Sequence, residues 1–192
     1  MKRATEAHVS ANLFELGIGN VVVTRFRGGG EAEIGVFLVD VFCLGVKNAY
    51  FTQASQSQYD RELLDRIMPA ANRKPIDPPS ARKLVEDAVA YAQHLGFAPH
   101  PDHKVACRVF GGINVAESTA SFSFGQNGKP LYVQGPNDSF EKCRRTLNQL
   151  RTRCGADNFD FMVVGGDSVI GELERAGFPI RQKVPAPPSE ME

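Results

Sequence analysis

Residues 21–46 read VVVTRFRGGGEAEIGVFLVDVFCLGV and contain the clearest strand signals in the chain. The first seven are rich in β-branched side chains, which favours a strand, and the three glycines that follow favour a turn. A three-residue loop would place Arg27 opposite Glu31. The same register places Arg25 opposite Glu33, so both pairs bring opposite charges together on one face of the sheet. This complementarity predicts a hairpin.

The returning segment, residues 33–46, is predicted to form one long strand. Its middle is apolar at odd and even positions alike, which is typical of a strand covered on both faces. Asp40 is the one acid within this apolar run, and an ionised carboxylate is costly there unless it is paired or hydrogen-bonded.

Five helices are predicted from apolar residues at helical spacing. The clearest has Ser80 as its N-cap and ends at Gly96. The others are expected over residues 9–16, 59–68, 140–154 and 168–175. The helix expected over 59–68 lies in a proline-rich stretch, residues 52–79, which we expect to be a surface connector.

The dipeptide Asn127-Gly128 is the strongest turn signal in the chain, because both residues tolerate a positive φ. It predicts a second hairpin, over residues 122–133, and residues 159–164 are predicted to form a further strand. We therefore expect an α+β fold, with a mostly antiparallel sheet built from two hairpins plus a further strand and with helices packed on it. One domain is expected over residues 1–180, followed by a proline-rich flexible tail over 181–192.

Composition excludes several classes of protein. The 192 residues contain 22 Lys+Arg and 22 Asp+Glu, so the formal charge is zero, which argues against a protein that coats nucleic acid. The sequence contains no apolar run of about 18 residues, so no membrane span is predicted. No secretory signal is recognisable at the N-terminus. The four cysteines form no CxxC pair and are expected to be reduced thiols, so we expect a cytoplasmic protein.

Four stretches of the chain are similar to parts of an uncharacterised bacterial protein family. They read GVFLVDVFCLGVKNA at 35–49, AYAQHLGFAPH at 90–100, FGQNGKPLY at 124–132 and GPND at 135–138. The resemblance spans roughly residues 17–164. It implies a bacterial, cytosolic, single-domain protein, and it supplies no activity, cofactor or catalytic residue.

Two clusters of residues are candidates for chemistry. Asp40, Cys43 and Lys47 could form the site of a small hydrolase or transferase, if a base lies near the thiol. The alternative is a buried Asp40 that accepts hydrogen bonds from loop amides, beside a core cysteine, and we favour this alternative. The second cluster comprises zinc-binding residue types without a zinc-binding spacing, and it is a weak metal candidate: His94, His100, Asp102, His103 and Cys107.

Basic residues form a third candidate site. Arg144, Arg145 and Arg151 lie with Lys142 and Arg153 on one predicted helix, and Arg25 and Arg27 could add to the patch. Such a patch could contact nucleic acid or a protein partner, and the alternative is a solvated helix face. A fourth segment, Gly165-Gly166-Asp167-Ser168, could approach a phosphate, but Asp167 would repel the anion and is better explained as a cap.

Taken together, these patterns favour a binding or adaptor module that contacts a protein or nucleic-acid partner through a sheet edge or through the arginine-bearing helix. The alternative is an enzyme built around Asp40 and Cys43. No acid–base pair, metal set or nucleophile–base pair in the sequence is specific enough to favour catalysis, and no cofactor is expected.

Overall fold

The computed structural model describes residues 4–163 and 167–178. The chain divides into two compact units, unit 1 (Met1–Pro130) and unit 2 (Leu131–Glu192). The predicted tail and the Gly165-Gly166 pair lie outside the described residues. The expectation of a single domain up to residue 180 stays a prediction.

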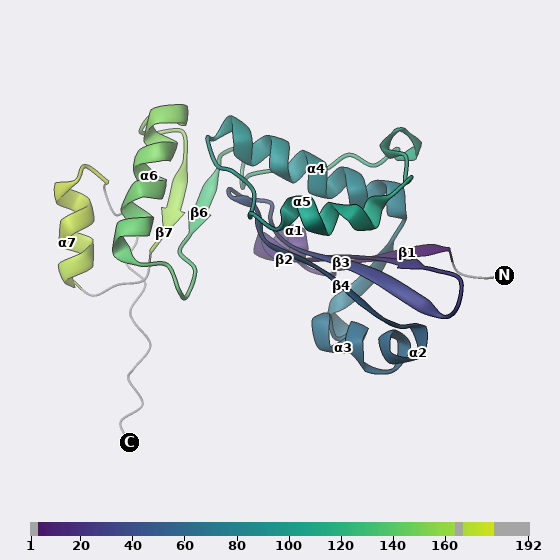
Figure 1. Cartoon of the computed structure of the whole chain (residues 1–192). Helices are drawn as coiled ribbons and strands as arrows, with labels where there is room; N and C mark the ends of the chain where they lie inside the picture. The colour runs from purple at the N-terminus through teal and green to yellow at the C-terminus, as the bar shows by residue number, and fades with distance from the viewer. Residues whose placement is uncertain (1–3, 164–166, 179–192) are drawn as a thin grey trace, which may run out of the picture. The chain divides into compact units, whose positions relative to one another are not determined.

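A five-stranded antiparallel sheet forms the centre of unit 1 (Figure 1). Its strands lie in the order β4-β3-β2-β1-β5, and every neighbouring pair is antiparallel. The strands are β1 (Thr5–Ser10), β2 (Ile18–Phe26), β3 (Glu31–Asp40), β4 (Gly45–Ser55) and β5 (Arg73–Ile76). With the helices described below, the sheet confirms the predicted α+β class.

Strands β2 and β3 form the predicted first hairpin. Arg25 pairs with Glu33 in the register, and the N–H of Arg27 donates to the carbonyl oxygen of Glu31 over 2.8 Å. The turn depends on glycine, because Gly29 has a φ of 91°, a left-handed conformation that other residues rarely adopt. The cross-strand charge pairs therefore identified both the hairpin and its register.

The prediction of one strand over residues 33–46 is wrong. The chain turns after Asp40, and β4 begins at Gly45. The Asp40 carboxylate accepts backbone N–H groups of the turn, and Gly45 has a φ of 66°. A Cβ at Gly45 would also lie 2.7 Å from the Ala88 carbonyl oxygen. The turn residues are apolar, and three of the four are buried (Val41, Phe42 and Cys43), so their pattern could not be distinguished from that of a buried strand.

The N-terminal helix predicted over 9–16 is also wrong in its first half. Residues Thr5–Ser10 form β1, and only α1 (Leu13–Leu16) is helical. Ala7 and Val9 are buried while their neighbours in β1 are half-exposed, the period of two that a strand with one covered face requires. β1 joins the sheet between β2 and the short strand β5, which the sequence did not predict.

Helices cover both faces of the sheet (Figure 1). On one face lie α4 (Pro78–His94) and α5 (His103–Ala106), and on the other lie α2 (Gln56–Gln58) and α3 (Leu64–Ile67). The predicted apolar stripe of α4 is buried, but its N-cap is Asp77, whose carboxylate accepts the N–H of Ser80 over 2.9 Å. Prolines fill the first two positions of the helix, which moves the cap upstream of the predicted Ser80.

The stretch predicted as a surface connector supplies part of the core instead. A π-helical turn (Tyr59–Leu63) joins α2 to α3, in broad agreement with the helix expected over 59–68. The core on this face consists of seven buried residues from both the sheet and this stretch: Val22, Ala32, Ile34, Val36, Tyr59, Leu64 and Met68.

Unit 2 has the order β6, α6, β7, α7. These elements span Leu131–Val133, Phe140–Cys154, Asp160–Met162 and Asp167–Arg175. Strands β6 and β7 pair in parallel, with α6 as the connection between them. Helix α6 has the predicted bounds, and the hydroxyl of Ser139 caps it by accepting the N–H of Lys142 over 3.3 Å.

The second predicted hairpin does not form. The Asn127-Gly128 turn itself is present, with φ values of 50° and 79°, and one bridge joins Gln126 to Lys129. Residues 118–125 form no strand, and β6 pairs with the distant β7. Directly before the turn, the N–H of Gly125 donates to the carbonyl oxygen of Val41 over 2.9 Å, so this side of the turn bonds to the β3–β4 connection and not to residues 130–133.

Candidate functional site

The cluster around Asp40 is a structural element of the β3–β4 turn. Oδ1 of Asp40 accepts the backbone N–H groups of Phe42 and Cys43, at 3.0 and 2.9 Å. Burial raises the pKa of Asp40, and the hydrogen bond from Cys43 and the charge of Lys47 oppose that shift. The Asp40 side chain is 5% exposed and Cys43 has no exposed surface, so neither can meet a substrate. These contacts are those of the structural alternative favoured from the sequence.

The residues of the proposed metal cluster come together only as two separate pairs: His103 with Cys107, and His100 with Asp102, whose Nδ1 and Oδ2 atoms lie 3.9 Å apart. The Sγ atom of Cys107 lies 3.2 Å from Nε2 of His103, one helical turn away. His94 instead contacts the carbonyl of its own helix, at Ala90, and Nδ1 of His100 accepts the N–H of Asp102. Across residues 4–163 and 167–178, no three His, Cys, Asp or Glu side chains gather in a way that could hold a metal ion.

The His103–Cys107 pair is a nucleophile beside a base, which the sequence reasoning missed. Burial raises the pKa of Cys107 to about 11, helped by the nearby charge of Glu86, and Arg82 opposes the shift. Burial also lowers the pKa of His103. Both shifts keep the pair neutral, as thiol and imidazole, whereas an activated cysteine needs a stabilised thiolate. The i, i+4 spacing of the two residues was the sequence signal for this contact.

The predicted contact arginines of unit 1 are held by one carboxylate. Glu33 accepts Nη2 of Arg25 at 2.7 Å and Nη2 of Arg27 at 2.9 Å. The hydrogen bond from Arg25 is the main factor that lowers the pKa of Glu33. Glu31, whose carbonyl accepts the N–H of Arg27, adds a second carboxylate to the hairpin, so its two arginines are balanced by two acids.

The basic helix α6 is also largely neutralised over its first two turns. Glu141 lies 2.9 Å from Nη2 of Arg144 and 3.7 Å from Nε of Arg145. Lys142 forms an ion pair with Asp138 at 2.6 Å. The two pairs with Glu141 are exposed and contribute little to stability, whereas the carboxylate of Asp138 is buried. All three pairs reduce the field available to attract a phosphate backbone.

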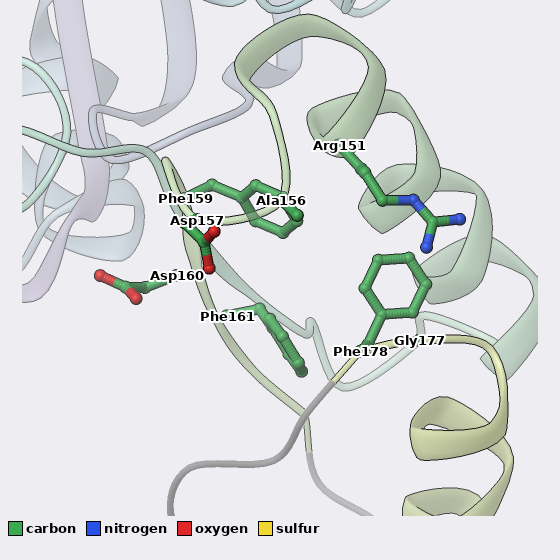
Figure 2. A pocket seen from close by; sticks show the side chains of 8 residues that line it. All are labelled: Arg151, Ala156, Asp157, Phe159, Asp160, Phe161, Gly177 and Phe178. Atoms are coloured by element: carbon green, nitrogen blue, oxygen red, sulfur yellow. The ribbon is translucent and has the colours of Figure 1, made fainter.

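The side chain of Arg151 points toward Phe178 and packs within unit 2 (Figure 2). Its guanidinium donates to the carbonyl of Ala176 over 3.1 Å and to Oδ1 of Asn148 over 2.6 Å. The same group lies 4.5 Å from the centre of the Phe178 ring. Arg151 thus connects α6 to the residues that follow α7, and these contacts occupy it within the unit.

A pocket of about 250 Å³ lies beside Arg151. Its lining includes the rings of Phe159, Phe161 and Phe178 and two acids, Asp157 and Asp160 (Figure 2). This volume is below that of typical small-molecule sites, which span about 300–1,000 Å³. The pocket is large enough for a single side chain, and its arginine is engaged by Ala176, Asn148 and the Phe178 ring.

The two edges of the five-stranded sheet differ sharply. The edge strand β5 has four residues, Arg73-Lys74-Pro75-Ile76, and carries two cations and a proline. Short length, charge and proline are the features that prevent an edge from pairing with another strand. The opposite edge strand, β4, has eleven residues, and its last eight, NAYFTQAS at 48–55, contain no charge, proline or glycine.

The outer edge of β4 is covered only at its start. The N–H of His100 donates to the carbonyl of Val46 over 2.9 Å, and the register shifts next to Lys47. From residue 48 to 54, no described segment other than β3 hydrogen-bonds to the β4 backbone. Tyr50 in the middle of this stretch is 42% exposed. An unpaired backbone edge of this kind can accept an added strand.

Comparisons with protein-family models, with curated proteins and with solved structures find no match to this chain. The bacterial origin implied by the resemblance stays a prediction. Within the described residues, no helix is both long enough and apolar enough to span a bilayer.

Proposed function

We propose that this protein is a protein-binding module that takes an extended strand of its partner onto the edge of β4. The observation that carries this proposal is the contrast between the two sheet edges, one short and guarded by Lys74 and Pro75, the other long and uncharged from residue 48 to 55.

Strand addition supplies affinity through the main chain. Each residue pair adds backbone hydrogen bonds, and alternate side chains of the partner lie over the faces of the sheet. On one of those faces the exposed ring of Tyr50 would contact the added strand, since aromatic residues favour cross-strand pairs with β-branched or aromatic neighbours.

The enzyme alternative has less support. Asp40 and Cys43 are sealed in the core, and the His103–Cys107 pair is held neutral, with a thiol pKa of about 11. Nucleic-acid binding also has less support than a protein partner, because Glu33 and Glu141 accompany four of the five proposed contact arginines, and Arg151 is engaged inside unit 2.

Affinity capture from a lysate of the host organism tests the proposal, with Thr52→Lys as the edge variant. A lysine in the middle of an edge strand opposes strand addition, while its aliphatic stem can follow the sheet surface. Arg144→Glu with Arg145→Glu forms the comparison variant, and both exposed substitutions should leave folding intact. We expect Thr52→Lys to capture no partner proteins, while the α6 double variant and the unmodified chain still capture them. Nuclease treatment of the lysate should not reduce this capture.

Two results would contradict the proposal that β4 binds the partner. Material that disappears after nuclease treatment, and that the α6 double variant fails to retain, would make α6 the contact surface and nucleic acid the partner. Equal capture by Thr52→Lys and by the unmodified chain would remove β4 from the binding site. A Ser57→Lys variant, with the same charge added to the exposed helix α2, controls for charge alone.

A further inference from the structure

The guarded strand β5 determines which assemblies of this chain are possible. Pairing of β4 in one copy with β5 in the next would be heterologous and would propagate into an open filament. Pro75, Lys74 and the short length of β5 oppose that arrangement. Pairing of β4 with β4 of a second copy is isologous, so it closes at two chains and leaves no unguarded edge.

The sequence of β4 suits pairing with itself. Around a two-fold axis, residues near the centre of the strand face their own copies, so that a charge placed there would meet a like charge. Residues 48–55 carry none, and the one cation of the strand, Lys47, lies outside this run at the register shift. The central residues, Tyr50 to Thr52, are aromatic or β-branched, which favours cross-strand contacts.

From these features we infer that the strand added to β4 is β4 of a second copy, in an antiparallel arrangement that joins the two sheets into one of ten strands. The inference rests on the proposed function of the β4 edge and names the partner. A neutral, matched strand of equal length is available in every copy, already extended and held by β3 along its inner side.

Sedimentation or light scattering of the purified full chain over a range of concentrations tests this inference. The unmodified protein should change from one to two chains per particle as concentration rises. Tyr50→Lys and Thr52→Lys should each weaken this association at least tenfold, and Ser57→Lys, which adds the same charge outside the edge, should leave it unchanged. Tyr50 is the safer position for folding because its side chain is exposed.

A mixing experiment identifies the partner as the same strand. Thr52→Lys and Thr52→Glu chains should each be monomeric alone and should associate when mixed, because residues near the two-fold axis face each other and opposite charges then attract. Failure of the mixture to associate overturns the inference, as does a protein that stays monomeric at every concentration. If such a monomer still captures other proteins through β4, the proposed function stands and only the identity of the partner is wrong.

Discussion

The backbone N–H of Cys43 donates to Oδ1 of Asp40 over 2.9 Å, inside a turn whose side chains are mostly apolar. With the N–H of Phe42 bonded to the same oxygen, one carboxylate satisfies two buried donors. Buried backbone donors are costly when unpaired, so the turn can be buried only because Asp40 is present. The acid that suggested catalysis in the sequence thus ends one strand and positions the next.

Replacement of Asp40 by alanine should destabilise the protein. The substitution leaves the N–H groups of Phe42 and Cys43 without their acceptor, which costs about 1–3 kcal/mol for such groups. Urea denaturation of the variant and of Asp65→Ala, an exposed carboxylate in a surface ion pair, measures the difference. A loss for Asp40→Ala no larger than that for Asp65→Ala would show that the turn does not depend on this side chain.

The stability of the protein should also depend on the ionisation of Asp40. Its pKa is raised in the folded state, mainly by burial, so its contribution to the free energy of unfolding is fully present below the unfolded-state pKa and is lost as pH rises through the folded-state pKa. We expect the unmodified protein to gain stability relative to Asp40→Asn as pH falls from 7 to about 3. Parallel curves for the two proteins would contradict the raised pKa.

The same region shows how far the sequence determines the fold. The β2–β3 hairpin was predictable because Arg25 and Glu33 mark its register, and α4 because its buried stripe repeats at helical spacing. The β3–β4 turn was not predictable from hydrophobicity, since Val41, Phe42 and Cys43 are as buried as the strands around them. Asp40 and Gly45 were its only local signals.

Pairing between distant segments was the other limit. The Asn127-Gly128 turn forms as its dipeptide predicts, yet β6 pairs with β7, which no local pattern indicates. The candidate sites likewise differ in whether local sequence could reveal them. Local spacing could have revealed the His103–Cys107 contact, whereas the outer position of β4 depends on the order of all five strands.

The thiol of Cys107 should react slowly with alkylating reagents at neutral pH. With a pKa of about 11, its thiolate fraction at pH 8 is on the order of a hundred times smaller than that of an ordinary cysteine. Iodoacetamide labelling followed by mass spectrometry should show a rate that rises up to about pH 11. Rapid labelling near pH 7 would instead indicate a thiolate–imidazolium pair with His103 and would revive a catalytic interpretation.

Loss of the Arg151 side chain should destabilise unit 2 by about 1–3 kcal/mol, because it removes two hydrogen bonds and the contact with the Phe178 ring. Arg151→Lys should not restore stability, since an ammonium lacks the planar fork that reaches both acceptors. The exposed Arg153 on the same helix supplies the control, and Arg153→Ala should change the unfolding free energy by less than about 0.5 kcal/mol. Equal effects of Arg151→Ala and Arg153→Ala would argue that Arg151 is a surface residue.

Amide hydrogen exchange along β4, followed by NMR, tests the open edge most directly. In dilute protein, alternate amides between Asn48 and Ala54 should exchange rapidly, because they point away from β3 and have no partner among the described residues. The same amides should become protected as concentration rises, while those of β5 stay unchanged. Uniform protection of residues 48–54 in dilute protein would contradict the account, because the edge would then already be covered by the chain itself.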